Sequence, residues 1–344
     1  MRSGIIKVIY TSNEGNNDVT DITDIIENIT ISTSLGSQSG RCEISLVGDG
    51  ASFSLGSRVQ IFDGETGVFV GHLMNVSMRE DNRFTATFYD QLRYLRNVDV
   101  IVYKDITASE LFRQICSVSE SLAHYQPGYR GQKIELGVID ESSYKLPATV
   151  AEGKSYWDMM RDAIEQTLAY DGKYYILRDV FGKLEFRDIE TLKTDFVIDD
   201  EGTGIGYDYT IGIDRNSFNQ VKIGYENQDA GAREWGIAYD QELIDKWGAL
   251  QYYQLLKFKL SKAELDARAK QQLLLVAKPT RDVSLTCFGD FRISAGCGVS
   301  LSLPKVRAFN GLNRFYVTSC EHHISCDLHT MELTLAVDNF GGGQ

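Results

Sequence analysis

The densest group of side chains that could bind a metal ion lies near the C-terminal end of the sequence. It contains Cys320, His322, His323, Cys326 and His329, and zinc prefers thiolate and imidazole ligands, four of them in a tetrahedron. On a β-strand Cys320 and His322 share one face and His323 points to the other, so a fourth ligand must come from across a turn. We therefore favour a hairpin with polar residues on its solvent face, and we predict no metal ion and no cofactor.

A glycine-rich stretch, Gly202-Thr-Gly-Ile-Gly206, superficially matches a nucleotide-binding loop. Such a loop lies between a strand and a helix, and the N-terminus of that helix faces the phosphate. Residues typical of β-strands follow the glycines in this sequence, and no Lys-Ser/Thr pair is present. The stretch therefore predicts a linker turn.

Neighbouring carboxylates occur at Asp140-Glu141 and at Asp199-Asp200. Glycoside hydrolysis requires two acids that face each other across a cleft and have separated pKa values, whereas sequence neighbours on a strand or turn point in different directions. No serine lies in a G-x-S-x-G elbow. His72 and His124 are lone histidines, which are more often structural than catalytic. We predict no catalytic residue and no enzymatic activity.

Composition limits the partners of the chain. The 344 residues include 35 Lys and Arg against 48 Asp and Glu, a net charge of -13. Such a protein does not coat nucleic acid by neutralising phosphates, although acidic side chains can line a conduit through which an anion slides. Most of these carboxylates are simple solubility charges. We expect no sequence-specific nucleic-acid binding.

The sequence also carries no sign of a membrane or an oxidising compartment. No apolar stretch approaches the length of a transmembrane helix, and the N-terminal residues lack the pattern of a signal peptide. The six cysteines are scattered without a CxxC pair. We expect reduced thiols in a protein made in the cytoplasm.

A repeated pattern organises the chain. Ser54–Ile61 reads S-x-G-x-x-V-x-[IL], and Ser294–Leu301 reads the same. In each case a further strand follows, near Phe69 and near Phe315. The stretch from Ser54 to Val76 has the alternation and the Asp-Gly turn of a β-hairpin. We interpret the echo as two related β units in one chain.

The elements that surround these units predict a mainly β fold with an α+β part. Many short strands separated by turns favour a first β-barrel module over 1–98. Helices that begin at Thr107 and Ser155 and a following hairpin favour a peripheral α+β module over 99–200. Residues 201–344 then read as a second β-barrel module with an inserted helix over 261–278. Residues 227–248 are irregular and can pack with the peripheral module instead.

This order of modules resembles the baseplate hub proteins of contractile phage tails and phage-tail-like bacteriocins, with the PBSX-type prophage hubs most similar. The resemblance covers nearly the whole chain. It is carried by Leu55–Ile61 with Phe69–Gly71, Tyr89–Leu95, Thr107–Leu111, Ser217–Ile223, Asp240–Leu250, Gly289–Leu303 and Tyr316–Leu335 with His323.

The resemblance implies a structural homotrimer with two tube-like barrels per chain, flanking or carrying the peripheral module. Three chains then present six similar modules, which can join a sixfold tail tube to a threefold central spike. Strands of neighbouring modules can continue each other's sheets and cover the edges. The implied partners are the spike, tail tube, tape measure and baseplate wedge proteins, in a virion or tail-like particle assembled in the bacterial cytoplasm.

Two other functions stay open. The carboxylates leave a tail-associated cell-wall hydrolase as an alternative, and the Tyr and Trp content leaves a glycan-binding baseplate module. No fused spike or lysozyme domain is recognisable, so the resemblance carries over no lytic residue. A spike would have to be a separate chain.

Overall fold

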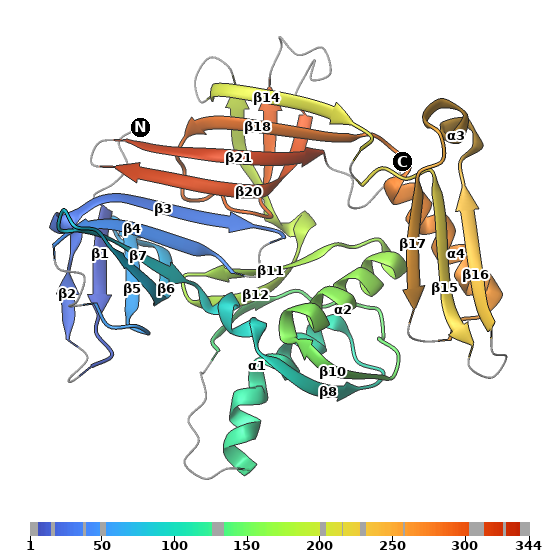
Figure 1. The fold of residues 1–344 in the computed structure, drawn as a ribbon, viewed down its shortest axis with the longest axis horizontal. Coiled ribbons are helices and arrows are strands. Elements are labelled where there is room, and N and C mark those ends of the chain that lie inside the picture. The colour runs from blue at the N-terminus through green and yellow to red at the C-terminus, as the bar shows by residue number, and fades with distance from the viewer. Residues whose placement is uncertain are drawn as a thin grey trace.

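The computed structural model describes residues 6–14, 18–36, 39–48, 53–125, 134–199, 204–214, 216–227, 232–256, 259–302, 313–325 and 328–337. Figure 1 shows the arrangement of its elements. One sheet of 13 strands dominates this part of the chain, and three smaller sheets and four α-helices accompany it. The predicted class, mainly β with an α+β part, is confirmed.

The first β module forms one end of the large sheet. Its strands pair in the order β3-β4-β7-β6-β5-β1-β2. Apolar residues alternate along them, as in β4, where Cys42, Ile44 and Leu46 are all fully buried. The elements are β1 (Ile6–Thr11), β2 (Val19–Asp21), the 3₁₀ helix η1 (Thr23–Ile25), β3 (Ile26–Ser34), β4 (Arg41–Val47), β5 (Arg58–Asp63), β6 (Thr66–Met78), β7 (Arg83–Tyr89) and the 3₁₀ helix η3 (Gln91–Arg96).

The second β module forms the other end of the same sheet. Its strands pair in the order β14-β18-β21-β20-β19-β13. The strands are β13 (Lys193–Asp199), β14 (Gly204–Gly212), β18 (Thr280–Phe288), β19 (Gly298–Ser302), β20 (Asn313–Ser325) and β21 (His329–Val337). Within the described residues the pairings of both modules follow an open path, so closure of each module into a barrel stays a prediction.

The α+β part lies beside the two β modules and is built around α1 and α2. The elements are β8 (Val98–Tyr103), α1 (Ala108–Tyr125), β9 (Leu136–Ile139), β10 (Thr149–Ser155), α2 (Tyr156–Asp171), β11 (Tyr175–Val180), β12 (Lys183–Asp188) and the 3₁₀ helix η4 (Ile189–Leu192). A capping box forms at the predicted helix start at Thr107, because the Thr107 amide donates to Glu110 Oε2 at 2.7 Å and the Glu110 amide donates to Thr107 Oγ1 at 3.2 Å.

An insertion between β14 and β18 carries its own small sheet. Its elements are β15 (Gln220–Asn227), β16 (Ala232–Tyr239), α3 (Gln241–Trp247), β17 (Gln251–Leu256) and α4 (Lys262–Val276), with the strands in the order β16-β15-β17. The inserted helix is therefore present, but β15, which lies within the predicted second β-barrel module, pairs in this separate sheet and not with the strands of the second β module. Alternation along a strand reports a buried face but not which sheet the strand joins.

The residues that sequence analysis left between two modules belong to this insertion. Within 227–248, residues Ala232–Tyr239 form β16, which pairs with β15, and Gln241–Trp247 form α3. Gly236 of β16 packs closely against the backbone of α4, since a Cβ there would lie 2.3 Å from the Leu265 carbonyl oxygen. Among the described residues, no helix is both long and apolar enough to cross a membrane.

Candidate assembly surface and buried polar clusters

The seam between the two β modules is a continuous ladder of backbone hydrogen bonds. The first part of β20 pairs with β19, and its second part, from Ser319 to Ser325, pairs antiparallel with β3. The amide of Leu35 donates to the Thr318 carbonyl at 2.9 Å, and Ser32 Oγ donates to Glu321 Oε2 at 2.7 Å. Figure 1 shows β14, β18, β21, β20, β3 and β4 as successive ribbons of one sheet.

The repeated sequence pattern produces the same turn in both modules. The Gly56 amide donates to the Leu73 carbonyl at 2.7 Å, and the Gly296 amide donates to the Val317 carbonyl at 2.8 Å. The amides of Leu73 and Val317 return hydrogen bonds to the carbonyls one residue after each glycine, at 2.8 and 2.9 Å. These matching bonds confirm the internal repeat that the sequence predicts.

The modules also share two irregularities. The pairing of β3 with β4 shifts between Ile26 and Asn28, and that of β14 with β18 shifts between Gly204 and Gly206. The strands β6 and β20 shift as well, at Leu73/Asn75 and Val317/Ser319. Bulges insert one residue and are specific features of a fold. Their recurrence aligns the two modules residue by residue.

The predicted hairpin is present as β20 and β21, but Cys320, His322 and His329 form a buried chain of hydrogen bonds instead of lying on its solvent face. Cys320 is fully buried, and His322 and His329 are 4% and 9% exposed. His322 Nδ1 lies 3.0 Å from His329 Nε2, and His322 Nε2 lies 2.9 Å from the carbonyl oxygen of Ile293. The inward face of the strand packs against the loop around Ile293, which lies far away in the sequence.

Both nitrogens of His322 are used for hydrogen bonds. Because the Ile293 carbonyl can only accept, Nε2 of His322 carries its proton, and Nδ1 then accepts from His329 Nε2. Burial lowers the pKa of His322 and of His329 to about 4, so both rings are neutral at pH 7. Phe291 stacks on His329 with 4.1 Å between ring centroids. The group binds the 290–297 loop to β20 and β21.

The remaining potential metal ligands of this stretch, His323 and Cys326, are not part of this chain of hydrogen bonds. His323 points to the other face, as predicted, where Nε2 lies 3.3 Å from Glu321 Oε1. Cys326 lies outside the described residues. In the part of the chain that the structure describes, no three or more His, Cys, Asp or Glu side chains gather in a way that could hold a metal ion.

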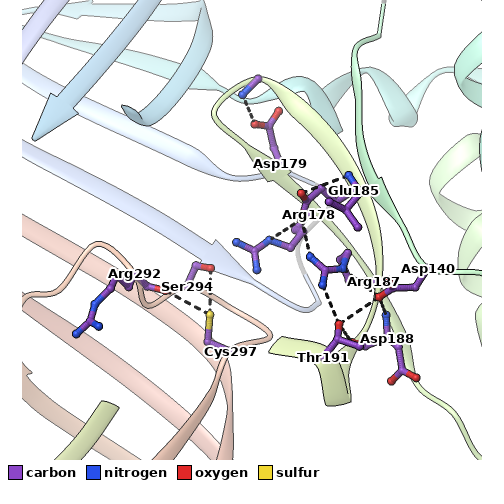
Figure 2. A network of polar contacts seen from close by, with 12 residues as sticks. Asp140, Arg178, Asp179, Glu185, Arg187, Asp188, Thr191, Arg292, Ser294 and Cys297 are labelled. Atoms are coloured by element: carbon purple, nitrogen blue, oxygen red, sulfur yellow. Dashed lines mark hydrogen bonds and ion pairs between the residues drawn. The ribbon is translucent and has the colours of Figure 1, made fainter. Parts of the chain in front are cut away.

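The neighbouring carboxylates of Asp140 and Glu141 bind different arginines. Asp140 Oδ2 accepts from Arg187 Nε at 3.0 Å, and Figure 2 shows Arg187 reaching Asp140 and Thr191. Partial burial raises the pKa of Asp140, but the bonds from Arg187 and Asp188 outweigh it and the pKa is lowered. A hydrogen bond from Arg113 lowers the pKa of Glu141. Neither carboxyl has the raised pKa of a general acid.

The other candidates also have structural surroundings. Gly204 and Gly206 lie in β14 and Asp199 ends β13, while Gly202 and Asp200 lie outside the described residues. His72 packs edge-on against the Tyr94 ring with 5.9 Å between centroids, and burial lowers its pKa. The side chain of His124 is outside the described residues.

Sequence analysis missed a buried acid pair at the joint between the first β module and the β11–β12 hairpin. Asp90 Oδ2 accepts from the Gly40 amide at 2.8 Å, and Asp179 accepts from the amides of Gln91 at 3.1 Å and Gly182 at 2.6 Å. Burial, and then the charge of Asp179, raises the pKa of Asp90. Burial raises the pKa of Asp179 to about 6. No local signal marks this pair, because the two residues are distant in the sequence.

These clusters stabilise joints between elements of the fold. The edges of the large sheet are surfaces to which the strands of other chains can add.

Comparison with known proteins agrees with this structural character. The chain is 25% identical to the uncharacterized protein YqbQ of Bacillus subtilis (strain 168) over 264 residues, covering 76% of this chain and 75% of YqbQ. It is 23% identical to the phage-like element PBSX protein XkdQ of the same organism over 270 residues, covering 77% of each.

The fold also matches a solved tail protein. The 43 kDa tail protein of prophage MuSo2 from Shewanella oneidensis superposes with a TM-score of 0.70 at 10% identity, over 98% of this chain and 100% of that one. The model of the YqbQ-like family matches residues 29–336. The chain therefore belongs to the YqbQ-like family, which the resemblance to PBSX-type prophage proteins predicted.

Proposed function

We propose that this chain is the structural hub of a contractile phage tail or phage-tail-like particle. Three copies form a ring of six β modules, which joins the sixfold tail tube to the threefold central spike. The observation that carries this proposal is the duplication of one β module within the chain, down to matching bulges and turn hydrogen bonds.

The physical reason is symmetry. In a ring with one module per chain, the number of modules equals the number of subunits. Such a ring cannot match both the sixfold axis of the tube and the threefold axis of the spike. A chain with two similar modules gives three subunits and six similar faces. The face toward the tube can then repeat six times, while the peripheral α+β residues and the insertion repeat three times.

The same proposal assigns the modules and the partners. Residues 1–98 and the strands β13, β14 and β18–β21 supply the two tube-like modules, and the rest of 99–200 with the insertion forms an outer support. The ring contacts the spike, tail tube and baseplate wedge proteins, and its lumen admits the tape measure protein. The net charge of -13 suits a lumen through which an anionic or extended chain slides without being trapped.

The oligomeric state tests the proposal. The purified chain, alone and with the tube and spike proteins of its own particle, is measured by light scattering and imaged in negative stain. We expect the mass of three chains and a ring with a central opening. A monomer that persists even when both partners are added contradicts the proposal.

Enzymatic activity is the alternative that the site geometry favours least. The acid neighbours Asp140 and Glu141 are each neutralised by an arginine and keep low pKa values. A zymogram on cell-wall material is expected to show no clearing. A cleared band at 38.6 kDa that survives purification would replace the structural proposal with a hydrolase.

A further inference from the structure

We propose that the outer edge of β14 in one copy pairs antiparallel with the second half of β6 in the next copy. The predicted register places Ile211 opposite Val76, Thr210 opposite Ser77 and Asp208 opposite Arg79. This inference rests on the homotrimer proposed above and names the strands and residues that join its subunits.

The first step is the equivalence of strands. The strand order β3-β4-β7-β6-β5 of the first module corresponds, strand by strand, to the order β14-β18-β21-β20-β19 of the second. The strand β14 therefore occupies the place of β3, and β6 occupies the place of β20. The bulges fix the alignment, because Gly206 follows the bulge in β14 as Asn28 does in β3.

The second step is that only one of two equivalent junctions is made inside the chain. The internal junction joins β3 to the second half of β20. In the described residues β14 has β18 as its single strand partner, and β6 beyond Leu73 pairs only with β7. Both edges that are equivalent to the internal junction are thus present, and within the described part of the chain neither has a strand paired to it.

The third step transfers the register. Inside the chain Thr33 pairs with Cys320, Ser32 with Glu321 and Thr30 with His323. Counted from the shared bulges, Thr33, Ser32 and Thr30 correspond to Ile211, Thr210 and Asp208 in β14. Cys320, Glu321 and His323 correspond to Val76, Ser77 and Arg79 in and just after β6.

The side chains brought together by this register are complementary. The pairs are two β-branched apolar residues, two hydroxyls and two opposite charges, and such cross-strand pairs stabilise a sheet. The transferred register was fixed by the backbone alone, so this match is independent support.

Exposed apolar side chains on both edges also support this pairing. Ile211 is 55% exposed on β14 and Met78 is 58% exposed on β6. An open strand edge with apolar side chains invites pairing, and proteins usually protect such edges with charge, proline or a covering chain. A second copy covers both edges at once.

The arrangement is head to tail, because each copy contributes β14 from its second module and β6 from its first. Such heterologous contacts build a ring when the rotation closes. Internal and external junctions then alternate around the ring, and every module is joined to its neighbours through equivalent strands.

Disulfide trapping tests the register. In the variant S77C/T210C the two new cysteines lie directly opposite each other across copies, at the separation that a disulfide accepts. Under mild oxidation, a denaturing gel is expected to show covalent dimers and trimers that disappear on reduction. The single variants S77C and T210C and the register control S77C/D208C should give little of this product.

Charge reversal tests the same pairing without new thiols. R79D and D208R are each expected to weaken association about fivefold or more, because like charges lie opposite each other. The double variant R79D/D208R should restore it. Circular dichroism on each variant checks that the fold is retained.

The outcomes separate this inference from the hub proposal. A trimer by light scattering, with no S77C/T210C cross-link and no response to charge reversal, overturns the edge pairing while the hub stands. A parent chain that stays monomeric with tube and spike proteins overturns both. Cross-linking of the register control in preference to S77C/T210C overturns the register.

Discussion

Gly56 and Gly296 adopt the same left-handed backbone conformation, with φ of +85° and +91°, at the same turn of the two β modules. Both amides donate to the long strand that follows, at 2.7 and 2.8 Å. Residues with a side chain avoid this left-handed conformation, so a substitution at either glycine strains the turn. The two glycines differ, however, in what surrounds them, so they offer a matched pair of tests.

Substituting alanine at these glycines should destabilise the two modules unequally. For G56A we expect about 1–2 kcal/mol, the usual cost of left-handed backbone for a residue with a Cβ. A Cβ at Gly56 would lie 2.9 Å from the side-chain nitrogen of Asn13, whereas a Cβ at Gly296 would lie 2.1 Å from Cδ1 of the buried Ile176, so G296A should cost more than G56A. Urea unfolding measures both. The control G36A, where a Cβ meets nothing within 4 Å, should change the free energy of unfolding little.

Acid should weaken the joint that His322 and His329 make. Their pKa values of about 4 lie below the 6.5 of an unfolded histidine, so the unfolded chain binds more protons between these values. The contribution of the two neutral rings to the free energy of unfolding is therefore complete above pH 6.5 and is lost as pH falls toward 4. For His322 this loss is about 3 kcal/mol. Thermal unfolding across this pH range measures the loss.

A matched pair of variants assigns this acid effect. H322Q keeps a donor for the Ile293 carbonyl but does not titrate, so its stability should depend less on pH between 6.5 and 4. H323Q changes the neighbouring histidine on the opposite face, so its free energy of unfolding should depend on pH as that of the parent does. An equal pH dependence for the parent and H322Q would show that the His322 ring does not cause the loss of stability in acid.

The acid pair Asp90 and Asp179 should act in the opposite direction. The pKa of Asp179 is raised to about 6 in the folded chain, above the value of an unfolded carboxyl near 4. Between these values the folded state therefore binds more protons than the unfolded chain. The contribution of Asp179 to the free energy of unfolding is complete below pH 4 and is lost as pH rises through 6. We expect D179N to flatten the decline in the free energy of unfolding between pH 4 and 6, although it loses one acceptor. D105N, at a surface carboxyl 74% exposed, should leave the decline unchanged.

Breaking α4 should unfold the insertion. Leu265 is fully buried, and its amide donates to the Ser261 carbonyl at 3.0 Å. L265P removes that bond and places a ring against the preceding turn, at about 3 kcal/mol or more beyond the loss of the side chain. L265A isolates the packing loss, about 2–5 kcal/mol. Limited proteolysis of 213–279 reports the result, and resistance of L265P equal to that of L265A would contradict the role of the helix backbone.

The sequence alone determined the local elements and the repeat. Capping pairs such as Ser261 with Glu264 fix helix starts through bonds between residues three apart, and both bonds are present in the structure. The glycines at 56 and 296 mark the repeated turn because few other residues tolerate that backbone. These features depend on near neighbours, so they can be read from the order of residues.

Only the tertiary structure decided which segments meet. Alternation shows that Cys320 and His322 share a face. Their burial, however, depends on Ile293 and His329, which the fold brings into contact with them. The strand β15 has the pattern of any half-buried strand, yet it joins the insertion sheet. Asp90 and Asp179 meet only because a hairpin 88 residues after Gln91 packs against it. Sheet membership and burial are set by long-range packing, which local sequence patterns do not encode.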